Sequence, residues 1–247
     1  WTKGKVIDID EYINFINTYK DYLTVCASVD SIPGEPRGAH AATAEEAAES
    51  VKKTWNNFIY MRERMVNPDI LLCTFHCGEP WEVLEKILSY KDEHGPIKYI
   101  AFGGLVGKAE PVINSFLEKA FRIVRESENP NVKIHAFGMT RLNYLEEYPF
   151  TSADSTSWLQ TANFGNIIID SKTICLSDRK LLSDDNIINK NQALKDAVEE
   201  RVNKYGFTIK ELSEDTNKRL MFNVRSCQEW ADNYKMKGNT SYKPSLF

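Results

Sequence analysis

The segment IKYIAFGGLVGKAEPVINSFLEKAFRIVRE, residues 97–126, decides the fold class because it holds one complete strand–turn–helix unit. Its first part is a short apolar run typical of a buried strand, and the glycines that follow predict a tight turn. Its second part has the composition and length of a helix. A strand followed directly by a helix is the repeating unit of a parallel α/β sheet.

The same alternation continues on both sides of this segment. Thr43 and Glu46 have the spacing of a capping box that opens a long helix, and Pro80 and Gly95 mark the start and end of another. We count five strand–helix units. Their predicted strands are YLTVCASVD (22–30), ILLCTFHCGE (70–79), IKYIAFGGLVG (97–107), NVKIHAFGM (131–139) and FTSADSTSW (150–158).

Two α/β architectures fit five such units: a doubly wound open sheet, or a (β/α)8 barrel of the TIM type that lacks its first strands. Polar residues and glycines cluster at the predicted strand ends, namely Asp30, His76, the glycines of 103–107, His135, Gly138 and Asp154. In a barrel the chemistry lies where strands end and loops begin, so this pattern favours the barrel.

We expect the barrel domain to cover residues 1–190 and a C-terminal helical segment, residues 191–247, to pack on it. The chain begins with Trp1 rather than Met and runs straight into a helix-like segment, IDEYINFINTYKDY (9–22). The barrel is therefore expected to be truncated at its N-terminus.

The composition, with 42% hydrophobic and 27% charged residues, is ordinary for a soluble globular protein. Its longest apolar runs are far too short to cross a bilayer, so no membrane association is expected. Five scattered cysteines predict reduced thiols and a cytoplasmic location. Cys73 and Cys77 with His76 between them suggest a metal site, but on a strand His76 points away from both. We therefore expect no metal.

The charge is unevenly distributed along the chain. The net charge is −4, yet residues 201–247 carry nine Lys/Arg and five Asp/Glu, a local charge of +4. A basic C-terminal region can contact phosphates, and Arg219 and Arg225 are the candidates. Their helical spacing is equally consistent with a solvated helix face.

The glycine-rich turn FGGLVGK (102–108) follows a strand and precedes a helix, as a phosphate-binding loop does. The Walker pattern fails because Phe102 and Ala109 stand where glycine and Ser/Thr are needed, and GxGxxG fails too. Two interpretations remain open. The bare backbone admits a flat ligand or a phosphate, or the turn simply needs glycine at positive φ.

His135 and Asp154 are the candidate reactive groups. His135 fits a packed histidine better than a catalyst, and a Ser-His-Asp hydrolase is not supported by any GxSxG motif. Asp154 lies among hydroxyl residues, which in a strand-end setting donate to the carboxylate and hold it ionised. Such a carboxylate attacks an anomeric carbon in retaining glycosyl transfer, with a second carboxylate on the same edge. Asp30 is the only other strand-end aspartate before it; a solvated loop is the alternative.

Taken together, these motifs resemble the tRNA-guanine transglycosylase superfamily, (β/α)8 barrels that exchange guanine for a 7-deazaguanine base. IAFGGLVG resembles the family's glycine loop, and HAFG followed by SADSTSW resembles its strand and nucleophilic aspartate. VCASVD resembles the strand whose aspartate reads the base, and FHCG stands where the family has a glutamine–glycine turn. The resemblance spans roughly residues 1 to 165.

The SxDSTSW form is most similar to short phage-encoded relatives that are thought to modify DNA. In those, an aspartate–serine–glycine motif with a second catalytic carboxylate precedes the segment like WTKGKVIDIDEYINFI, and this chain has no DSG. Lys108 replaces a glutamate, His76 replaces glutamine, and the cysteine-rich zinc site of the tRNA enzymes is absent. The resemblance thus implies a host-cytoplasmic enzyme acting on DNA rather than tRNA.

The roles that the resemblance implies are specific. Asp154 attacks C1′ of the target nucleotide, and Asp30 hydrogen-bonds the incoming or leaving base. The remaining base-binding positions are His76, Gly103, Gly104, Leu105, His135, Gly138 and Ser155. The implied partners are a polynucleotide and a free 7-deazaguanine base, with no cofactor. A barrel that binds a purine or nucleic acid without reacting, and a hydrolase using His135 and Asp154, are the alternatives.

Overall fold

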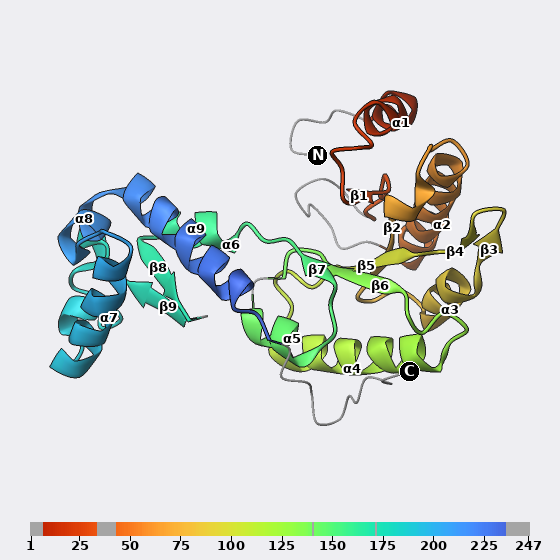
Figure 1. Ribbon diagram of the computed structural model, residues 1–247. Helices are drawn as coiled ribbons and strands as arrows, with labels where there is room; N and C mark the ends of the chain where they lie inside the picture. Colours follow the sequence, from red (N-terminus) through yellow and green to blue (C-terminus); the bar gives the residue numbers. More distant parts are fainter. Residues whose placement is uncertain (1–6, 34–42, 140, 171, 236–247) are drawn as a thin grey trace. The chain divides into compact units, whose positions relative to one another are not determined.

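A computed structural model describes residues 7–33, 43–139, 141–170 and 172–235 of this mixed α/β protein (Figure 1). The chain divides into two compact units. The described part of the first runs from residue 7 to Gly138 and includes Tyr148–Asp154. The described part of the second unit comprises residues 139, 141–147, 155–170 and 172–235.

A five-stranded parallel sheet, curled like half of a barrel, forms the centre of the first unit. Its strands are β1 (Cys26–Ala27), β2 (Leu71–His76), β5 (Tyr99–Gly103), β6 (Lys133–Ala136) and β7 (Ser152–Ala153). They lie side by side in chain order, each parallel to its neighbours. A doubly wound sheet reverses its strand order at a switch point, and these five strands show no such reversal.

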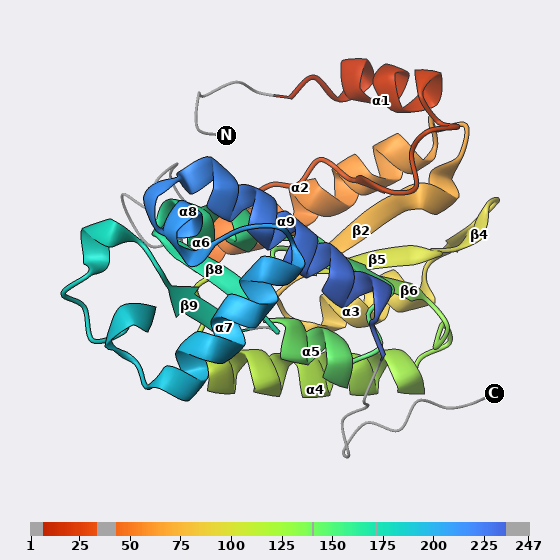
Figure 2. The same cartoon turned by 60° about the vertical axis from the view of Figure 1, so that its left-hand side comes forward.

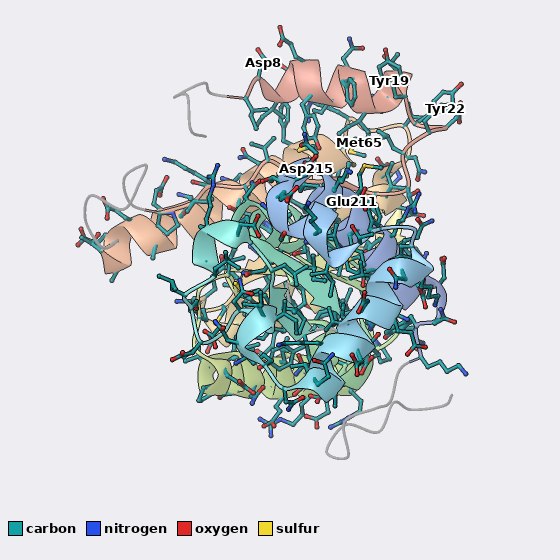
Figure 3. The ribbon with its side chains drawn as sticks, turned by 90° about the vertical axis from the view of Figure 1, so that its left-hand side faces the viewer. Asp8, Tyr19, Tyr22, Met65, Glu211 and Asp215 are labelled. Carbon is teal, nitrogen blue, oxygen red and sulfur yellow. The ribbon has the colours of Figure 1, made fainter. Side chains whose placement is uncertain are left out.

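Helix α1 (Ile9–Thr18) precedes β1. The connections between later strands of the first unit contain α2 (Ala44–Arg62), a 3-10 turn (Pro68–Ile70), α3 (Trp81–Ser89) and α4 (Glu110–Glu126). The predicted capping box of α2 is present, with Glu46 N donating to Thr43 Oγ1 and Thr43 N to Glu46. Asp8, labelled in Figure 3, caps α1 in the same manner by accepting from two backbone N–H groups.

The expected helix from Pro80 to Gly95 is shorter than predicted. It ends at Ser89, and the chain continues into a two-residue hairpin, β3 (Lys91–Asp92) and β4 (Gly95–Pro96). The reason lies in Arg62, which is 1% exposed. Its guanidinium donates to both Asp92 carboxylate oxygens, at 2.7 and 3.0 Å, and to the Gly95 carbonyl at 3.1 Å. Burial of this cation requires the hairpin that neutralises it.

The two faces of the sheet differ in chemistry. On the outer face, Phe75 and Phe102 pack against Trp81 of α3 and Phe116 of α4, with ring centroids 5.6 to 6.4 Å apart. Because side chains alternate along a strand, the next residues point to the opposite, inner face. That inner face carries polar groups, listed here from β2 to β7: Thr74, His76, Tyr99, His135 and Ser152.

The second unit holds an antiparallel hairpin and a set of helices (Figure 2). Its elements are α5 (Leu142–Glu147), α6 (Ser157–Asn163), β8 (Asn166–Ile169), β9 (Lys172–Cys175), two 3-10 turns (Asp178–Lys180 and Ile187–Asn189), α7 (Gln192–Lys204), α8 (Ile209–Glu214) and α9 (Thr216–Asp232). Its core contains Ile167, Leu176, Val202, Leu212 and Phe222. Because the hairpin shares this core with the helices, residue 190, the predicted boundary, falls inside the unit.

Helix caps define where α8 and α9 begin. Thr208 and Glu211 form a capping box on α8, and Asp215 accepts from Asn217 N at 2.7 Å to cap α9 (Figure 3). Lys218 Nζ lies 2.7 Å from Glu211 Oε1, and this hydrogen bond lowers the pKa of Glu211 to about 2. The turn between the two helices is therefore specified by polar side chains on the protein surface.

Candidate active site

The carboxyl edge of the half-barrel brings the predicted residues together in two clusters. Asp30 follows β1 and His76 ends β2, while Gly103 ends β5. Asp154 directly follows β7, and its backbone N–H donates to Ala136 O at 3.2 Å, so the strand pairing continues up to this residue. Since all five strands are parallel, their carboxyl ends share one edge of the sheet.

Asp154 is exposed and held by one oxygen. Its side chain is 58% exposed, whereas that of His135 is 8% exposed. Oδ1 accepts from the backbone N–H of Gly138 at 2.9 Å and lies 3.2 Å from His135 Nε2. Among the described residues no donor reaches Oδ2. The carboxylate is thus oriented from one side and open on the other.

His135 continues into a chain of hydrogen bonds behind Asp154. Its Nδ1 lies 2.6 Å from Ser152 Oγ, which in turn lies 2.6 Å from the hydroxyl of Tyr99. His135 pairs with Ser152 across β6 and β7, and with Ala101 across β5 and β6. Three adjacent strands therefore contribute side chains on the inner face. We call Tyr99, Ser152, His135 and Asp154 the Tyr99–Asp154 chain.

The prediction that neighbouring hydroxyl groups donate to Asp154 is wrong for Ser152 and Ser155. Ser152 points to His135, and Ser155 donates to Ser157 Oγ at 2.9 Å while accepting from Ser157 N at 3.0 Å. Strand alternation explains the first and the turn that opens α6 explains the second. Asp154 is oriented by an imidazole and a backbone amide instead.

The second cluster places His76 between two carboxylates. His76 Nε2 lies 2.8 Å from Asp30 Oδ2, and Nδ1 lies 2.9 Å from Glu79 Oε1. Glu79 Oε2 also accepts from the His76 backbone N–H at 3.1 Å. Asp30 Oδ1 accepts from Thr54 Oγ1 of α2 at 2.9 Å. We call Asp30, His76 and Glu79 the His76 cluster.

These contacts decide the charge of His76. Burial acts to lower its pKa, but the hydrogen bonds and negative charges of Asp30 and Glu79 outweigh burial and raise the pKa to about 10. At neutral pH His76 is an imidazolium whose two N–H groups each donate to a carboxylate. Both donors of the ring are therefore occupied within the cluster.

The glycine turn fits around His76. A Cβ on Gly103 would lie 2.8 Å from His76 Cδ2, so the flat group against this bare backbone is the imidazole. Gly104 and Gly107 have φ of +70° and +78°, which matches the interpretation that the turn needs glycine for its conformation. Leu105 is buried, with 4% exposure.

Gly138 is required for the conformation of the backbone, and it does not leave an open space for a ligand. Its φ is +61°, and a Cβ there would lie 2.6 Å from Val106 Cγ2. Only glycine therefore lets the chain turn so that this N–H reaches Asp154 while Val106 packs beside it.

The two arginines predicted to contact phosphate differ. Arg219 is 4% exposed, and its guanidinium donates to the carbonyls of Ala162, Leu212 and Ser213. Arg219 is thus a buried structural residue of the second unit, which corrects the expected phosphate contact. Arg225 is exposed and donates to Tyr205 O at 2.7 Å, so its phosphate contact stays a prediction.

Sequence reasoning missed Glu79 and Tyr99 as members of these clusters and Thr54 as a donor to Asp30, whereas Ser152 was expected, but as a donor to Asp154 rather than a partner of His135. Glu79 carried a signal, since it lies three residues after His76 in the turn that opens α3. Tyr99 carried none, because an apolar strand hides an inward hydroxyl until the register is known.

No helix among the described residues is both long and apolar enough to cross a bilayer. Within the same residues no group of three or more His, Cys, Asp or Glu side chains is arranged to hold a metal ion. The sequence matches no model of a known protein family and no curated protein.

Proposed function

We propose that this protein is a base-exchange transglycosylase similar to the tRNA-guanine transglycosylases, with Asp154 as its nucleophile. The observation that carries the proposal is the state of Asp154: an exposed carboxylate at the carboxyl edge of a parallel half-barrel, with Oδ1 fixed and Oδ2 receiving no donor from the residues that the structure describes. A fixed carboxylate with one unencumbered oxygen is what attack on an anomeric carbon requires.

The reaction proceeds in two displacements at C1′ of the target nucleotide. Asp154 Oδ2 forms a bond to C1′ as the bond to guanine N9 breaks, and guanine leaves with the electron pair and takes up a proton. A 7-deazaguanine base then attacks C1′ through N9, losing its proton, and the Asp154 carboxylate departs. One proton is taken up and one released, so the exchange is balanced and two inversions retain the configuration.

We assign base recognition to the residues next to Asp154 on the carboxyl edge of the sheet. Asp30 hydrogen-bonds the base, and His76 with the glycine turn forms the wall beside it. The substrate is a polynucleotide, DNA rather than tRNA, with the target base unpaired or flipped because a stacked base is out of reach. Arg225 is the remaining phosphate contact.

The full architecture is proposed to be a (β/α)8 barrel. Five parallel strands in chain order, with helices on the outer face, are the arrangement that such a barrel repeats around its axis.

A hydrolase is the second candidate, because Ser152, His135 and Asp154 form a Ser-His-Asp string. The order of exposure argues against it. In a hydrolase the serine faces the substrate and the aspartate is buried behind the histidine. Here the aspartate is the exposed end, and Ser152 lies between His135 and Tyr99.

The test is base exchange into labelled single-stranded DNA and tRNA, with a labelled 7-deazaguanine base and a denaturing gel for the covalent intermediate. Asp154→Asn should abolish exchange and adduct, and Asp184→Asn, an exposed aspartate of the second unit, should leave both unchanged. Exchange retained in Asp154→Asn would overturn the nucleophile. Bond cleavage that needs no added base and is lost in Ser152→Ala would establish the hydrolase, and ligand binding without any reaction would favour the non-catalytic barrel.

A further inference from the structure

We infer that Ser152 and Tyr99 are positioning residues that hold His135 in the tautomer with its proton on Nε2, so that the ring donates to Asp154. This inference deepens the proposed function and rests on it for the catalytic consequence. Neither residue touches the reacting atoms, and both act through His135.

The direction of each hydrogen bond in the chain follows from the one before it. The Asp154 carboxylate only accepts, so the proton between it and His135 belongs to Nε2. A neutral imidazole then has a lone pair on Nδ1 and requires a donor there, which the Ser152 hydroxyl supplies at 2.6 Å. The Ser152 oxygen in turn accepts from the Tyr99 hydroxyl at 2.6 Å. With a neutral ring, the ring proton and the two hydroxyl protons are thus each assigned to one hydrogen bond.

Because the Tyr99–Asp154 chain is largely buried, loss of one of its hydrogen bonds should change the tautomer of His135. Tyr99 and His135 are each 6% exposed, so bulk water does not readily replace a lost partner. Without the Ser152 hydroxyl, the proton of His135 is free to move to Nδ1. Nε2 would then present a lone pair to the Asp154 carboxylate, and that oxygen would keep only the Gly138 amide as a donor.

The arrangement also separates the roles of the two ends. Tyr99 of β5 and Ser152 of β7 lie on the inner face of strands that both pair with β6, whereas Asp154 lies beyond the last paired residue of β7. At the buried end of the chain, Tyr99 and Ser152 fix the position of the His135 proton, and at the exposed end Asp154 faces the substrate. Hydrogen-bond partners that fix the tautomer of a metal-ligating histidine typically change activity about 10- to 100-fold when mutated, and we expect an effect of the same order here.

The experiment uses the full chain and four variants: Ser152→Ala, Ser152→Thr, Tyr99→Phe and, for signal assignment, His135→Gln. Imidazole 15N chemical shifts report the His135 tautomer directly, with His135→Gln assigning its signals. We expect Nε2–H in the unaltered protein, loss of that single tautomer in Ser152→Ala and its return in Ser152→Thr. Exchange should show kcat about 10- to 100-fold lower in Ser152→Ala with KM nearly unchanged, and a smaller decrease in Tyr99→Phe.

The outcomes separate this inference from the proposed function. An Nδ1–H tautomer in the unaltered protein, or a Ser152→Ala variant with unchanged tautomer and kcat, overturns the inference. A Ser152→Thr variant that folds but regains neither property also overturns it. If the tautomer behaves as expected and the unaltered protein shows no exchange, the hydrogen-bond assignment stands and the proposed function fails.

Discussion

The two clusters at the sheet edge use the same residue types in opposite ways. In the His76 cluster the imidazolium lies between two carboxylates, and both of its N–H groups are consumed inside the cluster. In the Tyr99–Asp154 chain the imidazole has one carboxylate, and the chain ends in Asp154 Oδ2, to which no residue in the described part of the chain donates. A histidine with two acidic partners stabilises a site, whereas a histidine with one orients an exposed group.

The largest expected difference between the clusters is in activity. Asp154→Asn should lower exchange by at least about 10³-fold while changing the free energy of unfolding by less than about 0.5 kcal/mol, since the side chain is exposed. Asp30→Asn should have the larger effect on stability, a destabilisation of about 1–2 kcal/mol from the loss of a partly buried ion-pair partner, and a smaller effect on exchange, seen mainly as a higher KM for the base. Exchange assays and urea unfolding measure the two. Equal losses of exchange and equal changes in stability in the two variants would show that the two clusters do not differ in role.

The pH dependence of stability is the next effect. The pKa of His76 is about 10 in the folded protein and about 6.5 when unfolded, so its ion pairs stabilise fully below pH 6.5 and the contribution is lost as the pH rises toward 10. Across that window the unaltered protein should lose a few kcal/mol relative to His76→Gln. Urea unfolding at pH 6, 8 and 10 measures it. His94→Gln is the control, and a His76→Gln difference that does not change with pH would contradict the locked imidazolium.

The close contact between the glycine turn and His76 gives a third effect. Gly103→Ala should destabilise by about 2 kcal/mol, because its Cβ would lie 2.8 Å from His76 Cδ2 in a buried site. Gly107→Ala meets no atom within 4 Å and should cost about 1 kcal/mol for its φ of +78° alone. Thermal unfolding of both variants decides. A larger loss in Gly107→Ala would mean that the imidazole does not occupy this position.

The smallest expected effect is that of Ser155→Ala, which tests whether a hydroxyl supports Asp154 by its hydrogen bonds or only by being adjacent to it in the sequence. Ser155 is adjacent to Asp154 but bonds Ser157, so Ser155→Ala should alter exchange by less than about threefold and stability by about 0.5 kcal/mol. Ser152→Ala is its matched comparison. Equal losses of kcat in the two variants would show that hydroxyl density near Asp154, rather than the chain through His135, supports the nucleophile.

Much of the fold could be predicted from the sequence because local signals agreed with it. The capping box at Thr43, the apolar strands and the glycine turn each specify an element without help from distant residues. Helix α3 was overestimated because the reason for its end is Arg62, thirty residues away from Asp92 in the chain. Nothing local in the sequence indicates that β8 and β9 pair with each other in antiparallel fashion.

In the candidate site too, local sequence signals predicted some features, and residues distant in the chain determined the others. Strand-end positions drew attention to Asp30, His76 and Asp154, and the structure places all three on one edge. Their partners depend on register between strands, which a single sequence does not reveal. Burial likewise decides the role of Arg219, since a basic residue on a helix looks the same in sequence whether it faces solvent or core.

The order of the strands has a consequence for synthesis. Each strand of the parallel sheet after β1 pairs with the strand of this sheet that comes before it in the chain, up to β7. As the polypeptide leaves the ribosome, each new strand meets an edge that has already been made, and no described strand waits for a later segment to reach its predecessor. The parallel sheet can therefore grow one edge at a time from the N-terminal side.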